Sequence, residues 1–227
     1  MSKKALIVGG NGSLGKFVVN KFVNCPKKEW STISLDIFEN KNSHHNILLE
    51  KNFSEDKNLL STLDKKFSNL KIGKVDSVIC VAGGFDFAGL KSENLIFSLN
   101  FLCHVNLYSS VLSAQLANKY LNDSSLFALT SAAAIHNKVD TTAVLSYQLA
   151  KQGVENLFST LENNKDLLPN NTKLIKICPG VIDTESNRKN MPDEDKSNWT
   201  DPDKIATLLK NWSDNLNNAP KENYCLV

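Results

Sequence analysis

A tyrosine and a lysine stand four residues apart in the segment Tyr147-Gln148-Leu149-Ala150-Lys151. On a helix this spacing places the two side chains on one face. A phenol with its ordinary pKa of about 10 transfers protons poorly at neutral pH, and a neighbouring ammonium is expected to lower that pKa. The pair therefore predicts acid–base catalysis, with Tyr147 as proton donor or orienter and Lys151 as its tuning partner. Taken alone, the same spacing also fits a solvated helix face without a function.

A glycine-rich segment, Gly9-Gly10-Asn11-Gly12-Ser13-Leu14-Gly15, follows the apolar run at residues 5–8. Its G-x-G-x-x-G pattern allows a tight turn, a close backbone approach to a pyrophosphate and a helix start whose free N–H groups bind anions. Asp36 ends the next apolar run about 20 residues on, where a carboxylate would bind ribose hydroxyls and repel a 2′-phosphate. Together they predict a dinucleotide site that favours NADH over NADPH. An ordinary glycine turn is the alternative for the loop alone.

Short apolar runs alternate with longer amphipathic stretches, which is typical of alternating strands and helices. Strands are predicted at 5–8, 32–35, 75–81, 126–129 and 174–178, with an edge strand at 224–227. Helices are predicted at 14–23, 59–70, 95–121 and 143–161. Parallel strands joined by helical crossovers need helices on both faces of their sheet. The chain, 1–227, is therefore predicted to be one doubly wound, Rossmann-like α/β domain with a parallel sheet. Loops or lids are predicted at 39–46, 186–203 and 211–223.

The composition is that of an ordinary globular chain, with 227 residues of which 41% are hydrophobic and 22% charged. With 26 basic and 24 acidic side chains, the net charge of +2 argues against nucleic acid or an anionic membrane as the main partner. The first apolar run is too short for a signal peptide, and no run is expected to approach the roughly 18 residues of a membrane span. A cytoplasmic location is expected.

The cysteines and histidines do not form a recognisable metal or disulfide pattern. Five cysteines without a C-x-x-C pair argue against a disulfide framework and a zinc site. His44 and His45 are adjacent, so their side chains are expected to point apart, and no carboxylate cluster accompanies them. No metal site is therefore predicted.

Four segments occur in the order that marks the short-chain dehydrogenase/reductase family, which the sequence resembles over most of its length. They are the glycine loop, the turn Ala82-Gly83, the pair Tyr147 and Lys151, and the segment from Pro179-Gly180 to Thr184. The resemblance implies hydride transfer with a nicotinamide cofactor. It also implies that Lys151 binds the nicotinamide ribose, that Thr184 lies at the carboxamide, and that Asn106 is the helix asparagine that supports a proton relay. The predicted cofactor-binding residues are Gly9, Asn11, Gly12, Ser13, Leu14, Gly15, Asp36, Ala82, Gly83, Gly84, Asn106, Tyr147, Lys151, Pro179, Gly180 and Thr184.

One departure from the family pattern narrows the chemistry. Family members that oxidise alcohols usually carry a serine about a dozen residues before the tyrosine, whereas this sequence has Ala132-Ala133-Ala134 in that region. The nearest hydroxyls belong to Thr130, Ser131, Thr141 and Thr142. Within the family, the sequence looks most like the members that reduce quinonoid dihydropterins, which share this lack. The segments that carry this resemblance are 8–15, 80–85 and 187–200. It implies NADH-dependent reduction of a small-molecule pterin, in which a strongly electrophilic substrate needs mainly orientation and a proton.

A planar pterin needs an aromatic or apolar wall, and Phe85 directly follows a glycine turn at a strand end, where it could provide one. It could equally cap the core. The polar segment 186–203 is predicted to be a substrate lid, with Arg188, Met191 and Trp199 as the side chains most able to cover a ligand. An ordinary surface loop is the alternative.

In many members of the family, helices equivalent to 95–121 and 143–161 form a four-helix dimer interface, so the resemblance implies a homodimer. Two alternative functions remain open at this stage. One is reduction of another quinone-like or carbonyl substrate. The other is a non-catalytic protein that senses NAD(H), although a sensor has no need of a tuned phenol.

Overall fold

The computed structural model describes residues 2–26, 29–137 and 142–227. Its centre is a seven-stranded parallel sheet with the order β3-β2-β1-β4-β5-β6-β7. The strands are β1 (Lys3–Val8), β2 (Trp30–Asp36), β3 (His45–Leu48), β4 (Val75–Cys80), β5 (Leu121–Thr130), β6 (Lys173–Cys178) and β7 (Tyr224–Leu226). The predicted parallel α/β sheet is confirmed.

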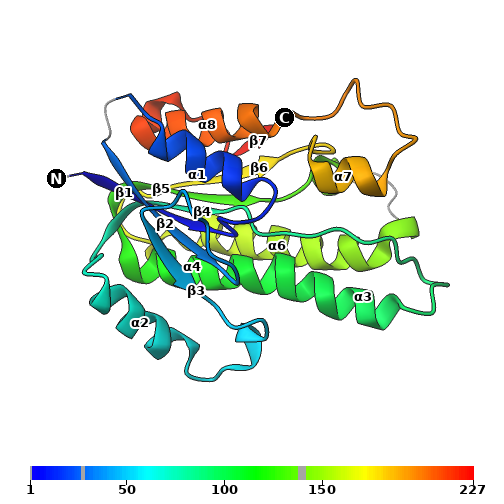
Figure 1. Cartoon of the computed structure of the whole chain (residues 1–227), viewed down its shortest axis with the longest axis horizontal. Helices are drawn as coiled ribbons and strands as arrows, with labels where there is room; N and C mark the ends of the chain where they lie inside the picture. Colours follow the sequence, from blue (N-terminus) through cyan, green and yellow to red (C-terminus); the bar gives the residue numbers. More distant parts are fainter. Residues whose placement is uncertain (1, 27–28, 138–141) are drawn as a thin grey trace.

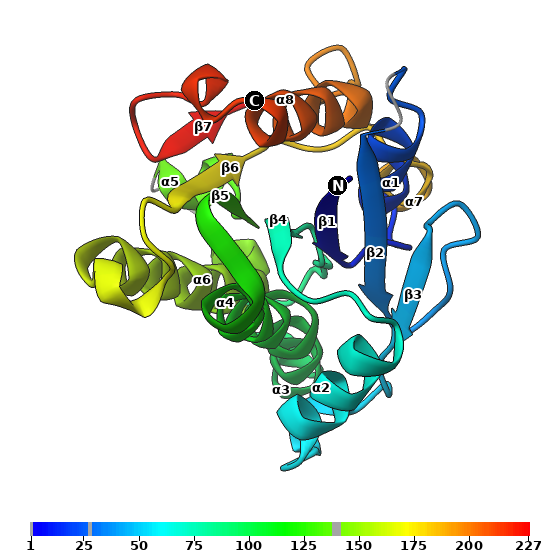
Figure 2. The ribbon, with the colours of Figure 1, turned by 90° about the vertical axis from the view of Figure 1, so that its left-hand side faces the viewer.

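Helices cover both faces of the sheet, as Figures 1 and 2 show. One face carries α1 (Gly15–Val23) and α8 (Pro202–Asp214), which also pack against each other. The other face carries α2 (Leu59–Asn69), α3 (Leu95–Leu102), α4 (Ser109–Tyr120) and α6 (Leu145–Asn163). Successive strand residues point to opposite faces, so Leu6 and Ile7 of β1 belong to two different core clusters, one on each side of the sheet.

Shorter elements connect these layers. They are η1 (Phe53–Glu55), α5 (Ala133–His136), η3 (Thr142–Val144), η4 (Lys165–Leu167), α7 (Glu185–Asn190) and η5 (Leu216–Asn218). A π-helical segment, η2 (Cys103–Tyr108), joins α3 to α4, so that the helical run continues from Leu95 to Tyr120.

By length and composition alone, the run Leu95–Tyr120 is apolar enough to cross a membrane, so the expectation that no segment approaches such a span is wrong. The run packs on β4, β5 and α6 with one side. On the other side, Ile96 and Phe97 are each 76% exposed. Polar residues interrupt the apolar ones in this run, which hides it in the sequence, although the average hydropathy over the run is still high.

Four elements, β3, α7, α8 and η5, lie at least partly where loops were predicted. The segment 39–46 ends in the edge strand β3, which pairs with β2 from Ile33 and His45 onwards. The segments 186–203 and 211–223 flank α8 and overlap both of its ends. Asp201 caps this helix by accepting a hydrogen bond from the N–H of Asp203 at 2.8 Å, and Pro202 occupies its first turn. Both are strong start signals, and they lie inside the region interpreted as polar loop.

Candidate active site

The carboxyl ends of the parallel strands lie along one edge of the sheet. There, the glycine loop follows β1, Ala82-Gly83-Gly84 follows β4, Ser131 follows β5 and Pro179-Gly180 follows β6. The strand order changes direction between β1 and β4, because β2 and β3 lie on one side of β1 and the later strands lie on the other. In open parallel sheets, ligands bind at such a switch point. The fold therefore brings the segments with predicted cofactor residues to one place.

Two of the loop glycines have no room for a side chain. Gly9 has φ +81°, and a Cβ there would lie 2.5 Å from Cα of Ala82. A Cβ on Gly15 would lie 1.9 Å from the Gly9 carbonyl oxygen. Asn11, Gly12 and Ser13 lie on the accessible part of the loop, whereas Leu14 is buried where α1 begins. The loop is thus held close to the β4 turn and leads into a helix start that can receive a pyrophosphate.

The Asp36 carboxylate contacts the glycine loop directly. Its Oδ2 accepts a hydrogen bond from the N–H of Asn11 at 2.9 Å, and its Oδ1 accepts one from the N–H of Phe38 at 3.2 Å. The loop is also held from its other side, because buried Asn40 donates from Nδ2 to the Gly10 carbonyl oxygen at 2.7 Å. Asn40 was not among the predicted site residues, since an asparagine in a polar loop carries no signal of its own.

Lys151 lies in α6 with its side chain buried against the sheet, and the residue is only 4% exposed. Its ammonium donates to the carbonyl oxygen of Thr130 at 3.1 Å. Burial lowers the pKa of Lys151 to about 8, because a charged group loses its hydration there. Below that pH, Lys151 remains a cation next to the predicted nicotinamide site.

Tyr147 lies one turn before Lys151, but its pKa is not lowered as predicted. Burial raises the pKa of Tyr147 to about 12. The ammonium of Lys151 lies 6.0 Å from the centre of the Tyr147 ring and is bound to the Thr130 carbonyl oxygen. The prediction of a lowered pKa is therefore wrong for this structure. Tyr147 keeps its proton at neutral pH, which suits a proton donor rather than a base.

Asn106 lies in the π-helical segment η2, a type of distortion that often occurs at functional sites. It is buried and bonded to the β4 turn, because its Oδ1 accepts from Gly84 N–H at 3.3 Å and its Nδ2 donates to the Gly84 carbonyl oxygen at 3.1 Å. A Cβ on Gly83 would lie 2.9 Å from Asn106 Oδ1 and 3.7 Å from Lys151 Nζ. The structure thus places Asn106, Gly83 and Lys151 in one cluster.

Two of the four hydroxyls nearest the position of the missing family serine are directed elsewhere. Thr130 donates from Oγ1 to the Cys80 carbonyl oxygen at 2.9 Å, and Ser131 donates to the Glu155 carboxylate. Thr142 begins the short turn η3, and Thr141 lies outside the described residues. Neither Thr130 nor Ser131 is therefore oriented to polarise a carbonyl beside Tyr147.

Two phenylalanines build an aromatic wall next to Tyr147. The rings of Phe85 and Tyr147 meet edge to face with centres 5.0 Å apart. Phe87 meets Phe85 in the same way at 4.8 Å. Both phenylalanines are partly open to solvent, with Phe85 38% exposed, so Phe85 is not a buried core cap. Phe87 was missed, although an aromatic residue two positions after Phe85 was a readable signal.

The turn after β6 and the residues that follow it are tied to the end of the sheet. Pro179 accepts at its carbonyl oxygen from Ala133 N–H at 2.9 Å, and Gly180 N–H donates to the Val227 carbonyl oxygen at 2.9 Å. Thr184 is buried, and its hydroxyl oxygen caps α7 by accepting from Asn187 N–H at 3.2 Å.

The predicted lid, residues 186–203, is bonded mainly to itself and to its own base. Its ends are joined because Asp183 N–H donates to the Thr200 carbonyl oxygen at 2.8 Å. Arg188 makes a two-pronged ion pair with Asp183, with Nη2 2.7 Å from Oδ2. Trp199 lies under the ammonium of Lys196 at 5.5 Å, and partly buried Met191 ends α7. The contacts described for Arg188 and Trp199 thus stay within 183–199 rather than reaching Phe85.

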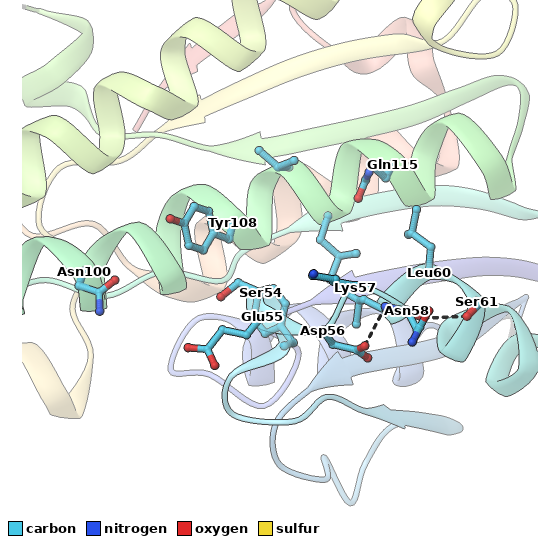
Figure 3. A pocket seen from close by; sticks show the side chains of 14 residues that line it. Ser54, Glu55, Asp56, Lys57, Asn58, Leu60, Ser61, Asn100, Tyr108 and Gln115 are labelled. Carbon is cyan, nitrogen blue, oxygen red and sulfur yellow. Dashed lines mark hydrogen bonds between the residues drawn. The ribbon is translucent and has the colours of Figure 1, made fainter.

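A separate cavity of about 640 Å³ lies between η1, the start of α2 and the long helical run, and Figure 3 shows its lining. Asn100, Tyr108 and Gln115 come from the helical run, and the segment from Ser54 to Ser61 faces them. None of the sequence-predicted site residues lines this cavity. The candidate active site is therefore the strand-end cluster and not this cavity.

Comparisons with known proteins agree with that geometry. The chain matches the family of short chain dehydrogenases over residues 3–195. A relative from Dictyostelium discoideum, named dihydropteridine reductase, is 34% identical over 220 residues, which cover 97% of this chain and 91% of that protein. The match therefore includes both the cofactor segments and the lid segment.

Solved structures at low identity share the fold. A short chain dehydrogenase family protein from Francisella tularensis has a TM-score of 0.78 at 16% identity and covers 100% of this chain and 97% of that chain. 4-Hydroxyisoleucine dehydrogenase complexed with NADH has a TM-score of 0.72 at 17% identity, with coverages of 100% and 96%. The structure of BdcA in complex with NADPH has a TM-score of 0.73 at 15% identity, and the match covers 99% of this chain and 92% of that chain. The chain belongs to the short-chain dehydrogenase/reductase family of NAD(P)H-dependent oxidoreductases.

Proposed function

We propose that this protein uses NADH to reduce a quinonoid dihydropterin to the tetrahydropterin. The observation that carries the proposal is the hydroxyl arrangement beside Tyr147, where Thr130 and Ser131 donate away from the site. An ordinary ketone needs a polarising donor in addition to the tyrosine, whereas a quinonoid substrate is already electrophilic. The name of the Dictyostelium discoideum relative supports the same substrate class.

The chain's own residues supply orientation and a proton. Bound NADH would provide the hydride, and the phenol of Tyr147 would donate the accompanying proton before it is reprotonated from solvent. A pKa of about 12 keeps that phenol protonated at neutral pH. Lys151 and Asn106 lie next to the turn that follows β4. There they can bind the nicotinamide ribose and fix the position of Tyr147 relative to it. Phe85 and Phe87 provide a wall for the planar substrate.

The preference for NADH rests on Asp36. The N–H of Asn11 and the Asp36 carboxylate lie at hydrogen-bonding distance, so that a negative charge stands at the edge of the glycine loop. A 2′-phosphate at that position would be repelled, whereas ribose hydroxyls would be bound. The cofactor proposed is therefore NADH, with NADPH less favoured.

The segment 186–203 is proposed to act as a lid that closes over the pterin. To do so, Arg188 would exchange its surface ion pair with Asp183 for contact with the ligand. Exposed ion pairs contribute little to stability, so the exchange has a low cost. The single domain 1–227 would then contain both the cofactor site and its cover.

The assembly proposed is a homodimer through the long helical run and α6. The exposed apolar side chains Phe97, Phe101 and Leu149 lie on these two helices, and their exposure supports an interface there. A cytoplasmic location is proposed because none of the five cysteines, all within the described residues, forms a disulfide. Sedimentation and cell fractionation test these two points.

The test of the activity is steady-state NADH oxidation with freshly generated quinonoid dihydropterin, run beside a simple ketone and beside NADPH. We expect pterin reduction with NADH at least about 100-fold more efficient than ketone reduction. Tyr147→Phe should lower kcat by about 100-fold, the usual contribution of a general acid, while NADH affinity stays within about twofold of wild type. Efficient ketone reduction, or intact NADH binding without pterin turnover, would contradict the proposal.

A further inference from the structure

A largely buried ion pair lies one helical turn beyond the proposed catalytic pair, between α6 and β6. Glu155 stands one turn after Lys151 on the same helix, α6. Its carboxylate binds the ammonium of Lys176, which comes from the middle of β6, and the side chains of the two residues are only 14% and 9% exposed. The Lys176 ammonium also lies 4.9 Å above the ring of Phe158. The loss of hydration on burying two charges offsets most of their mutual attraction. The presence of this pair is therefore not explained by stability alone.

The second oxygen of Glu155 connects the pair to the active site. It accepts a hydrogen bond from the hydroxyl of Ser131, the residue that follows β5. Ser131 also donates its N–H to the Ile177 carbonyl oxygen at 2.8 Å. The preceding residue, Thr130, presents the carbonyl oxygen that receives the Lys151 ammonium. Glu155 thus anchors the strand end on which Lys151 rests.

Several groups surround Lys151, and among them Glu155 supplies the negative charge. Tyr147 from α6, Cys80 from β4 and Cys178 from β6 face the lysine, together with the amide of Asn106. Burial raises the pKa of the Cys80 thiol and raises that of Cys178 to about 12, so both thiols are neutral at pH 7. Burial lowers the pKa of Lys151, while Cys80, Cys178 and Glu155 each act to raise it, and of these three groups only Glu155 is a carboxylate.

We propose that Glu155 is a positioning residue for Lys151: through Ser131 its carboxylate fixes the strand end whose carbonyl oxygen binds the ammonium, and its negative charge acts on that ammonium. Lys176 moderates this charge from the other side. The inference rests on the proposed role of Lys151 at the nicotinamide ribose. It goes beyond that role because Glu155, Lys176 and Ser131 are not among the residues assigned to the cofactor or the substrate.

The test is NADH affinity measured across pH 6–10 by fluorescence titration, with no pterin present. Glu155→Gln removes the negative charge and should move the alkaline loss of binding to lower pH. Lys176→Gln leaves the carboxylate unopposed and should move the same transition to higher pH. The double variant should lie between the two. Glu162→Gln on the same helix, where the side chain is exposed and bonded to Asn223, is the matched control and should leave the transition unchanged.

A purely structural ion pair would behave differently. Both single variants would then weaken binding equally without moving the transition, and that result would overturn the proposal. Ser131→Ala keeps both charges and guards against variants that fail to fold, and it should weaken binding several-fold at an unchanged transition pH. A wild-type profile with no alkaline transition would overturn the role of Lys151 as well. A transition that neither charge variant moves would overturn only that of Glu155.

Discussion

The cofactor side and the substrate side of the site are built in opposite ways. On the cofactor side, Gly9 lies against Ala82, and Asp36 and Asn40 hold the glycine loop with hydrogen bonds. On the substrate side, Phe85 and Phe87 are partly exposed, and the lid bonds to its own base through Asp183 and Arg188. The glycine loop is therefore held in place by the fold, whereas the proposed lid would have to exchange its present contacts to reach a ligand. Substitutions should accordingly separate into effects on cofactor affinity and effects on substrate KM.

The largest effect is expected from Gly9→Ala. A side chain there adds a clash with Ala82, with a Cβ only 2.5 Å from its Cα, to the strain of a positive φ. NADH affinity should fall by at least about 100-fold, because the loop can no longer reach the pyrophosphate. Gly73→Ala is the matched control, since Gly73 has φ +65° but open space around it. Equal losses of NADH affinity in the two variants would show that backbone strain at a positive φ, and not the close packing of the glycine loop, determines the affinity.

Lys151→Met should remove activity and yet stabilise the protein. The depression of the Lys151 pKa from 10.5 to about 8 corresponds to about 3 kcal/mol against folding at neutral pH. The unfolded state binds the proton more tightly, so the wild-type penalty is complete below pH 8 and disappears as pH rises towards 10.5. Turnover should fall about 1,000-fold or more, while urea unfolding at pH 7 shows a gain of about 1–3 kcal/mol.

The pH dependence of that gain provides the control. The difference in unfolding free energy between Lys151→Met and wild type should shrink between pH 8 and pH 10. A difference that stays constant with pH would show that packing, and not the buried charge, accounts for the change.

Asp36→Ser should change the choice of cofactor without blocking the site. Loss of the carboxylate removes the repulsion of a 2′-phosphate, so the ratio of NADPH to NADH affinity should rise by about 10- to 100-fold. Titration with each cofactor measures the ratio. Glu39→Gln, which changes an exposed carboxylate in the same loop, should leave it unchanged. An unchanged ratio in the Asp36 variant would show that other residues determine the choice between NADH and NADPH.

The smallest effect is expected on the substrate side. Arg188→Ala removes an exposed ion pair with Asp183, so it should alter the pterin KM by about two- to fivefold and leave NADH affinity unchanged. Lys189→Ala, the exposed neighbour in α7, should change neither. An effect of Arg188→Ala on NADH binding would mean that the two sides of the site are not separate.

The cofactor side is also the part that the sequence predicts best. Glycine spacing and a carboxylate at a strand end reflect backbone geometry directly, so the places of Gly9 and Gly15 in the loop and of Asp36 at the end of β2 can be predicted from the residue pattern alone. The short edge strand β3 and the helix α8 were not predicted, because their apolar residues are few and lie among polar ones. Ile205, Leu209 and Trp212 do carry a helical spacing, and the cap at Asp201 marks the helix start.

Burial and distant contacts could not be predicted in the same way. The pKa of Tyr147 was expected to fall because Lys151 is four residues away, but the direction depends on where the ammonium lies. It lies over the ring and binds Thr130, 21 residues away in the chain, while burial of the phenol dominates. Asn40 and Glu155 act through partners that only the folded chain brings near.

The most direct test of the account is a single turnover. The protein, loaded with one equivalent of NADH, is mixed rapidly with quinonoid dihydropterin while NADH fluorescence is recorded. We predict complete oxidation of the bound NADH in one phase, and a phase about 100-fold slower for Tyr147→Phe with the same amount of NADH bound. NADH that stays reduced in the wild-type protein, or a rate that does not change when the Tyr147 hydroxyl is removed, would contradict the account.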